Sequence, residues 1–277
     1  MRAWIDGQLL DNPAAPAVSI RDHGLVVGDG VFETLKVIED QPFALALHLD
    51  RLERSAAGLG LPALDRGLIT KGVEAVLEAA PTTYGRLRIT VTGGPAPFGS
   101  GRVEVAPTVI IGLEDATPNP DTTKVVSVRW RRNEHGATTG LKTTSYAENV
   151  IALAEAREHG ATEAIFANTV GDLCEGTGSN VFYVLDGALK TPTLSSGPLA
   201  GITRALVLEW FGAEETDEPL AEVEEYATEV FLTSSLRDVQ AVTAWGTRTL
   251  PHGPVTRAAQ EAWRTNERSL LGLSALS

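Results

Sequence analysis

The chain has 277 residues, of which 43% are hydrophobic and 21% are charged, a composition typical of one large or two smaller globular domains. A net charge of −13 disfavours nucleic acid and anionic membranes as partners, although a local pocket can still bind a small anion. Cys174 is the single cysteine, which rules out an intrachain disulfide, and no apolar run approaches the roughly 20 residues of a membrane span. We therefore expect a cytoplasmic protein.

The first part of the chain alternates extended and helical patterns. We expect a hairpin over Ala3–Leu9, an extended segment over Gly28–Val37, a helix within Phe43–Leu59, a helix over Ile69–Ala80 that ends before Pro81, and strands over Gly85–Thr92 and Val103–Leu113.

A polar stretch, EDATPNPDTT, follows these elements and contains two prolines without any periodicity. We therefore predict an N-terminal α/β lobe over 1–114, a linker over 115–123 and a C-terminal lobe over 124–277, giving an α/β or α+β fold in two lobes. The expected elements of the second lobe are a strand over Lys124–Arg131, a helix from a capping box at Ser145–Glu148 to His159, strands over Ala164–Ala167 and Asn180–Leu185, a helix that opens at Gly201, and a strand over Glu229–Thr233.

Two side chains suggest a cofactor that carries an aldehyde and a cationic ring nitrogen. Lys142 precedes a predicted helix and is a candidate amine nucleophile, although a loop lysine is usually solvated and inert. Glu175 lies in a Gly-Thr-Ser-Asn turn among apolar residues, so its carboxylate needs a partner. A protonated ring nitrogen, an arginine or backbone amides would each provide that partner.

Three further patterns suggest phosphate binding. Arg51 in HLDRLERS can bind an oxyanion with two N–H groups, although a surface ion pair with Asp50 or Glu53 is normally the favoured interpretation of such an arginine. Gly201-Ile202-Thr203 opens a helix, where free amides favour an anion. Thr233-Ser234-Ser235 offers hydroxyls after a strand. Together they provide an arginine, a helix N-terminus and a hydroxyl-bearing turn.

Other catalytic motifs are absent from the sequence. It has no phosphate loop of the GxxxxGK[ST] type, no dinucleotide fingerprint, no HExxH and no GxSxG. The histidines are scattered along the chain without a close pair, so we expect no metal site.

Six motifs in order resemble the class IV aminotransferase family, the fold-type IV enzymes that depend on pyridoxal 5′-phosphate (PLP). They are DHGLVVGDGVFETLKV, LHLDRLERS, GLKTTSYAENV, LCEGTGSNVF, PLAGITRALV and VFLTSSLRDV. The resemblance covers nearly the whole chain. It implies a smaller N-terminal α/β lobe, a larger C-terminal lobe with a barrel-like β-sheet, and a homodimer that acts on a small-molecule amine.

The resemblance also implies a role for each matching residue. Lys142 would be the Schiff-base lysine and proton shuttle, and Glu175 would bind the pyridine nitrogen. Leu199 would pack against the ring, and Asn180 would order the loop that carries Glu175. The residues implied for the phosphate are Arg51, Ile202, Thr203, Ser234 and Ser235.

Within the family, the sequence most resembles members that are 4-amino-4-deoxychorismate lyases. Branched-chain aminotransferases usually have a tyrosine five residues after the lysine, where this chain has Ala147. The segment GGPAPFGSGR lacks the Arg-x-His pair of well-known D-amino acid aminotransferases. We thus expect a lyase that forms 4-aminobenzoate and pyruvate for folate synthesis, with an aminotransferase for D- or branched-chain amino acids as the alternative. Candidate substrate residues are Phe32, Arg102, Arg131, Arg132 and Tyr146.

Overall fold

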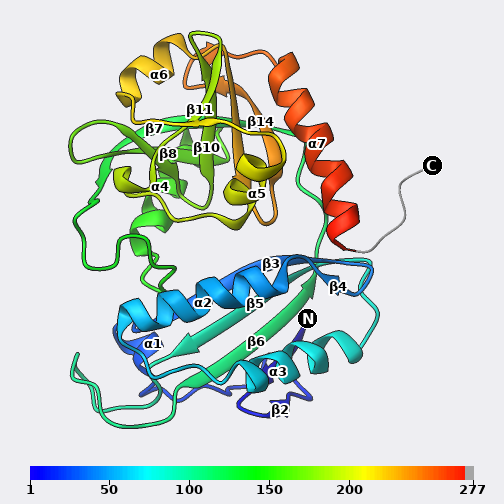
Figure 1. Ribbon diagram of the computed structural model, residues 1–277. Helices are drawn as coiled ribbons and strands as arrows, with labels where there is room; N and C mark the ends of the chain where they lie inside the picture. The colour runs from blue at the N-terminus through cyan, green and yellow to red at the C-terminus, as the bar shows by residue number, and fades with distance from the viewer. Residues whose placement is uncertain (272–277) are drawn as a thin grey trace. The chain divides into compact units, whose positions relative to one another are not determined.

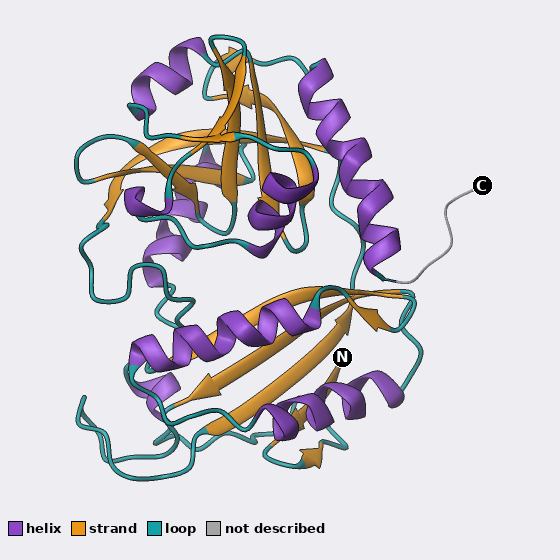
Figure 2. Ribbon diagram, viewed as in Figure 1, coloured by secondary structure: helices purple, strands orange, loops and turns teal. Residues whose placement is uncertain are grey.

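The computed structural model describes residues 1–271 and divides into two compact units, each a mixture of helices and strands (Figures 1 and 2). Unit 1 comprises Met1–Pro118 and Leu141–Ser145, and unit 2 comprises Asn119–Gly140 and the residues from Tyr146 onward. The first crossing between the units, after Pro118, falls inside the predicted linker. The expected lobe over 124–277 was continuous, whereas Leu141–Ser145 leaves it and packs with unit 1.

Unit 1 is a six-stranded antiparallel sheet in the order β2-β1-β6-β5-β3-β4. Its elements are β1 (Arg2–Ile5), β2 (Gln8–Leu9), α1 (His23–Val26), β3 (Gly30–Ile38), β4 (Gln41–Pro42), α2 (Leu45–Leu59), α3 (Arg66–Glu78), β5 (Tyr84–Thr92) and β6 (Thr108–Asp115).

One face of this sheet carries the apolar core of unit 1. Alternate residues of β3, β5 and β6 pack there against α2 and α3, as expected when a strand exposes every second side chain to one face. The core of β3 consists of Val31, Leu35 and Val37, so Glu33, which has the same parity, also points toward α2. A carboxylate thus occupies a position that the pattern reserves for an apolar residue.

Unit 2 is built on a nine-stranded curled sheet in the order β12-β11-β10-β13-β14-β7-β8-β9, with β15 paired to β14. Its elements are β7 (Thr122–Arg132), α4 (Ala147–Glu158), β8 (Glu163–Asn168), β9 (Leu173–Gly176), β10 (Asn180–Leu185), β11 (Ala188–Thr191), the 3₁₀ turn η1 (Leu194–Ser196), α5 (Ile202–Trp210), β12 (Glu214–Glu215), α6 (Leu220–Tyr226), β13 (Glu229–Ser234), β14 (Asp238–Trp245), β15 (Arg248–Thr249) and α7 (Pro254–Leu270).

The sheet of unit 2 has apolar clusters on both faces. Val125 of β7 belongs to one cluster, which includes α6, whereas Val126 and Val128 belong to the other, which includes alanines of α4. Adjacent strands β14, β7 and β8 pair in parallel, and most other pairs are antiparallel. The curled mixed sheet confirms the expected α/β class and barrel-like character.

Two local predictions were wrong. The predicted capping box at Ser145 does not form, because Tyr146 occupies the N-cap position of α4 without a side-chain hydrogen bond. Ser145 Oγ instead donates to the Gly28 carbonyl, and Glu148 pairs with Arg132. The strand predicted from Val103 begins at Thr108. Among residues 1–271, no helix has both the length and the apolarity needed to cross a membrane.

Candidate active site

The backbone around Lys142 is fixed on two sides within unit 1. The Phe32 amide of β3 donates to the Lys142 carbonyl at 2.9 Å, and the Lys142 amide donates to Ser55 Oγ of α2 at 3.2 Å. Thr143 forms an antiparallel bridge with Val31. The predicted nucleophile therefore lies on a short non-helical segment that a strand and a helix hold in place, an arrangement suited to presenting a reactive side chain.

The Lys142 ammonium lies over the buried ring of Phe32, 4.5 Å from its centroid. The guanidinium carbon of Arg88 is 3.8 Å from the same centroid. Both distances are within the range of cation–π attraction. Phe32, a predicted substrate residue, thus links the predicted lysine to an arginine that the sequence did not single out. Arg88 is exposed and belongs to β5, which pairs with β3.

Arg51 is buried and forms a bidentate ion pair with Glu33. Arg51 Nε donates to Glu33 Oε1 at 2.8 Å and Nη2 donates to Oε2 at 2.7 Å, while His48 Nδ1 lies 2.7 Å from Oε2. Burial opposes ionisation of Glu33, but the hydrogen bonds from Arg51 and His48 outweigh it and lower its pKa to about 2. The surface ion pair considered for Arg51 is therefore replaced by a buried one with a residue that sequence reasoning missed.

Helical spacing explains how α2 assembles this region. His48, Arg51 and Ser55 follow one another at i, i+3 and i+7, so they share one face of the helix. A Cβ added to Gly58, one turn further along, would lie 2.6 Å from Leu141 Cδ2. The missing side chain at Gly58 therefore lets the segment that carries Lys142 approach the helix closely.

Arg102, another predicted substrate residue, is occupied by contacts within unit 1. Its Nε donates to Asp29 Oδ2 at 2.7 Å, its Nη2 donates to Asp29 Oδ1, and its remaining contacts cap α2 at the carbonyls of Leu59 and Gly60. The hydrogen bond from Arg102 lowers the pKa of Asp29. This placement favours a structural role for Arg102 over the predicted role in substrate binding.

In unit 2, Glu175 lies on β9 with two neighbours that orient its carboxylate. The Leu199 amide donates to Oε2 at 2.9 Å, and Arg132 Nε is 3.2 Å from Oε1. Arg132 also packs over the Phe166 ring, with 4.1 Å between the guanidinium carbon and the centroid. Arg132, predicted to bind substrate, is thus a partner of the glutamate predicted to bind the cofactor. Arg131 is exposed on β7.

Asn180 connects the Glu175 turn to the start of α5. Its Nδ2 donates to the Leu199 carbonyl at 2.9 Å, and a Cβ at Gly201 would clash with its Oδ1. Leu199 therefore binds Glu175 through its amide and Asn180 through its carbonyl. The ordering role implied for Asn180 has a structural basis in these contacts, because one backbone segment links the glutamate to the helix N-terminus.

Two buried hydroxyls of unit 2 have no hydrogen-bond partner within residues 1–271. They are Thr203 Oγ1, in the first turn of α5, and Thr233 Oγ1, next to Asn180 in the strand register. Their exposed fractions are 2% and 1%, and a buried hydroxyl without a partner is costly. Ser234 Oγ accepts from the Arg237 amide, and Ser235 follows it in the same turn. These groups can donate to an anion at the positive end of the helix dipole.

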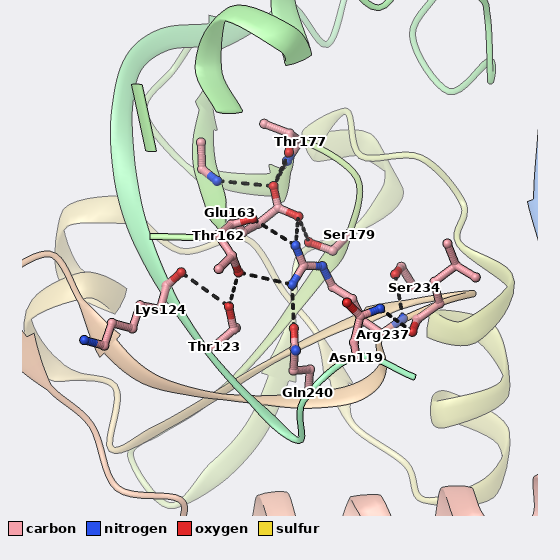
Figure 3. A network of polar contacts seen from close by, with 12 residues as sticks. Asn119, Thr123, Lys124, Thr162, Glu163, Thr177, Ser179, Ser234, Arg237 and Gln240 are labelled. Carbon is pink, nitrogen blue, oxygen red and sulfur yellow. Dashed lines mark hydrogen bonds and ion pairs between the residues drawn. The ribbon is translucent and has the colours of Figure 1, made fainter. Parts of the chain in front are cut away.

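A second glutamate, Glu163, anchors the turn that follows Glu175 (Figure 3). Its carboxylate accepts from the Thr177 amide at 2.9 Å, from the Thr177 hydroxyl and from Ser179 Oγ at 3.0 Å. Arg237 lies 3.5 Å from Glu163 Oε2 and also binds Gln240. The network therefore joins the turn after Glu175 to the turn that carries Ser234 and Ser235, and sequence reasoning missed it.

Comparison with known proteins places these features in a family. The model of the family "Amino-transferase class IV" matches residues 30–245, so the chain belongs to the class IV aminotransferases. A putative branched-chain-amino-acid aminotransferase of Methanocaldococcus jannaschii is 30% identical over 282 residues, covering 95% of this chain and 96% of that protein. The aminodeoxychorismate lyase of Bacillus subtilis is 30% identical over 214 residues, covering 74% of this chain and 72% of that protein.

One of the similar solved structures contains the cofactor. It is a hypothetical aminotransferase from Mycobacterium tuberculosis in its PLP-bound form, with a TM-score of 0.82, 26% identity and coverage of 96% of this chain and all of that one. The protein is a PLP-dependent enzyme. Its own residues suit the cofactor: the hydroxyl of Thr203 is buried without a partner in the described chain in the first turn of α5, that of Thr233 is likewise unpartnered on β13, and Glu175 would supply the carboxylate. Among the described residues no cluster suited to a metal is present.

Proposed function

We propose that Lys142 binds PLP covalently and moves the proton at the reacting carbon of the substrate. The bound cofactor supplies an electron sink beside that carbon. The observation that carries the assignment is the position of Lys142, whose backbone is held by Phe32 and Ser55 and whose ammonium lies over the Phe32 ring. Glu175, held by the Leu199 amide, keeps the ring nitrogen protonated.

We also propose which residues bind the phosphate group of the cofactor. Arg51 provides the guanidinium, the amides of Ile202 and Thr203 provide the helix N-terminus, and Ser234 and Ser235 belong to the neighbouring turn. The support for this assignment is chemical: each group is a donor, and the hydroxyl of Thr203 is buried without a partner in the described chain.

The reaction we propose is the lysis of 4-amino-4-deoxychorismate. A proton leaves the carbon that bears the amine, the ether bond to the enolpyruvyl group breaks, and 4-aminobenzoate and pyruvate are released. Lys142 is the base and acid for these proton transfers. The substrate carries two carboxylates, and Arg88, which shares the Phe32 ring with Lys142, is a candidate for one of them. The exposed Arg131 is a candidate for the other.

An aminotransferase for branched-chain or D-amino acids is the second candidate. The relative from M. jannaschii favours it, because its similarity extends over 95% of this chain, whereas the lyase of B. subtilis matches 74%. Arg88 would then bind the single α-carboxylate of an amino acid. The two reactions share Lys142 and Glu175 and differ in whether an amino acceptor is needed.

Supplying the two kinds of substrate separately tests the proposal. With 4-amino-4-deoxychorismate alone, we expect pyruvate and 4-aminobenzoate in equal amounts without an added keto acid. With amino acids and keto acids, we expect much slower amino transfer. Amino transfer without any lyase turnover would overturn the lyase and establish the second candidate.

The role of Lys142 is tested by reducing the holoenzyme with borohydride and mapping the modified peptide. We expect the label on Lys142 and none on the exposed Lys71, which serves as the control. Lys142→Ala should abolish both the label and the turnover. A label that persists at another lysine of the variant would show that the assignment is wrong.

We further propose that the enzyme is a cytoplasmic homodimer. The support for the compartment is the single, buried cysteine, which suits a reducing environment. The support for the dimer is the resemblance to a family whose members are typically dimeric. Sedimentation at several protein concentrations would test it.

A further inference from the structure

Glu33 contacts both His48 and Arg51, and these three residues are here called the Arg51 clamp. Glu33 Oε1 accepts from Arg51 Nε at 2.8 Å, and Glu33 Oε2 accepts from both Arg51 Nη2 and His48 Nδ1 at 2.7 Å. The side chains of Glu33 and His48 are fully buried, and that of Arg51 is 6% exposed. Three hydrogen bonds therefore fix the plane of the carboxylate, which in turn fixes the plane of the guanidinium.

The guanidinium of Arg51 is planar, so the edge that pairs with Glu33 fixes the direction of its other N–H groups. Pairing through Nε and Nη2 is side-on, and it uses two of the five N–H donors of an arginine. The other edge, formed by Nη1 and Nη2, is directed away from Glu33. That edge has the geometry for a second bidentate contact with an oxyanion.

The charges of the clamp suit an orienting role. Glu33 is ionised, because its hydrogen bonds hold its pKa at about 2. Burial lowers the pKa of His48, and the charges of Arg51 and Lys142 lower it further against the opposing effect of Glu33, so His48 donates Nδ1–H as a neutral ring. A buried ion pair contributes little net stability compared with apolar residues of the same size. Its more distinctive contribution is geometry.

We propose that Glu33 and His48 are positioning residues that hold Arg51 ready for the phosphate of the cofactor. This inference rests on the proposed role of Arg51 in phosphate binding. Without the clamp, a long arginine side chain would have to be ordered when the cofactor binds, at the expense of affinity. With the clamp, that ordering has already taken place in the folded protein.

The test compares two ligands that differ only in the phosphate. PLP and pyridoxal are titrated separately into the full-length protein after removal of cofactor, and the ratio of their dissociation constants measures how strongly the protein prefers the phosphate. For Glu33→Gln we expect this preference to fall about tenfold. The amide oxygen can still accept a hydrogen bond from Arg51, but the amide NH₂ group faces the remaining donors of Arg51 and His48 and cannot accept from them. Pyridoxal should bind nearly as in the wild type.

His48 allows a rescue experiment. His48→Asn keeps a donor close to the position of Nδ1 and should retain most of the preference for PLP, whereas His48→Phe removes the donor and should reduce it several-fold. This pair also keeps the proposal testable if Glu33→Gln does not fold.

Two controls separate positioning from general damage. Arg51→Gln should reduce the preference by about 100-fold, and thus sets the scale of the full phosphate contact. Asp29→Asn breaks a similar bidentate pair, that of Asp29 with Arg102. It should lower the melting temperature while leaving the preference for PLP unchanged.

Each outcome has one reading. If Arg51→Gln leaves the preference unchanged, the phosphate assignment of Arg51 fails. If Arg51→Gln lowers the preference and Glu33→Gln and His48→Phe do not, the phosphate assignment stands and the positioning role is overturned. A higher preference in Glu33→Gln would also overturn it, because Glu33 would then oppose the phosphate by its charge.

Discussion

Two glutamates on neighbouring strands of unit 2 differ in the burial of their carboxylates. Glu163 on β8 is 1% exposed. Its carboxylate accepts from Thr177, from Ser179 and from the amide of the next residue, and Arg237 lies beside it. Glu175 on β9 is 14% exposed at its side chain, with the Leu199 amide and Arg132 as neighbours. The two carboxylates therefore differ in burial and in the kind of neighbour that surrounds them.

The comparison shows that burial alone does not identify a functional acid. Thr177, Ser179 and Arg237, which contact the Glu163 carboxylate in Figure 3, come from the turns that it joins, so this carboxylate has a structural role. The Leu199 amide and Arg132 orient the Glu175 carboxylate, and the Glu175 side chain is 14% exposed, more than that of Glu163. Substitutions of each carboxylate distinguish an enclosed, structural acid from an oriented, functional one.

The largest effect should come from removing the enclosed carboxylate. Glu163→Ala leaves the Arg237 guanidinium and the Thr177 amide without their buried partner, so we expect a loss of about 3–5 kcal/mol in the free energy of unfolding. Glu163→Gln keeps an acceptor and should lose about 1–2 kcal/mol. Urea unfolding measures both. A Glu163→Gln protein that is stable but has lost most of its turnover would contradict the structural assignment.

Glu33 is a similarly buried carboxylate in unit 1, and its contribution to stability should depend on pH in the acidic range. The folded-state pKa of Glu33 is about 2, below its ordinary value of 4.5. Its contribution is therefore complete above pH 4.5 and is lost as the pH falls toward 2. By linkage the shift corresponds to roughly 3 kcal/mol.

The measurement is urea unfolding of the wild type and Glu33→Gln at several pH values between 6 and 2. We expect the difference in stability between the two proteins to shrink as the pH falls through this window. A difference that stays constant with pH would show that Glu33 is not preferentially ionised in the folded state.

For the oriented carboxylate, the effect should fall on activity. Glu175→Gln cannot hold a positive charge on the ring nitrogen, so we expect turnover to fall on the order of 100-fold while PLP remains bound. The free energy of unfolding should change by less than that of Glu163→Ala. Near-normal turnover would mean that another residue keeps the ring nitrogen protonated.

Periodicity predicted the elements of the fold that have strong local patterns. The helix α2 and the strand β5 were found within a few residues of their bounds, since each shows its period over several turns or alternations. The short strands β9 and β11 were not predicted, because four residues carry too little pattern. The capping box at Ser145 failed because the hydroxyl has a tertiary partner, the Gly28 carbonyl, that local sequence does not reveal.

The residues of the candidate site also fall into those that local motifs predicted and those that depend on tertiary packing. Lys142 and Glu175 were predicted because short motifs surround them. His48 and Glu33 were missed because their contact joins residues 15 apart through the packing of α2 on β3. One signal was available, a glutamate at a core-facing position of a strand otherwise lined by valine and leucine. Arg88 could not be found without the pairing register of β5 and β3.

The smallest effect should come from the buried Thr203 hydroxyl. Its removal should stabilise the cofactor-free protein and weaken the binding of PLP. Thr203 Oγ1 is buried without a hydrogen-bond partner in residues 1–271, so Thr203→Val should raise the stability of the cofactor-free protein by about 1 kcal/mol. The same change removes a donor to the phosphate and should weaken PLP binding about tenfold.

Thr191→Val is the matched control, since Thr191 is equally buried but donates to the Val181 carbonyl at 2.8 Å. It should lower stability by about 1 kcal/mol and leave PLP affinity unchanged. If Thr203→Val destabilised the cofactor-free protein as Thr191→Val does, Thr203 would be a satisfied structural hydroxyl, and the distinction between enclosed and available polar groups would fail at this position.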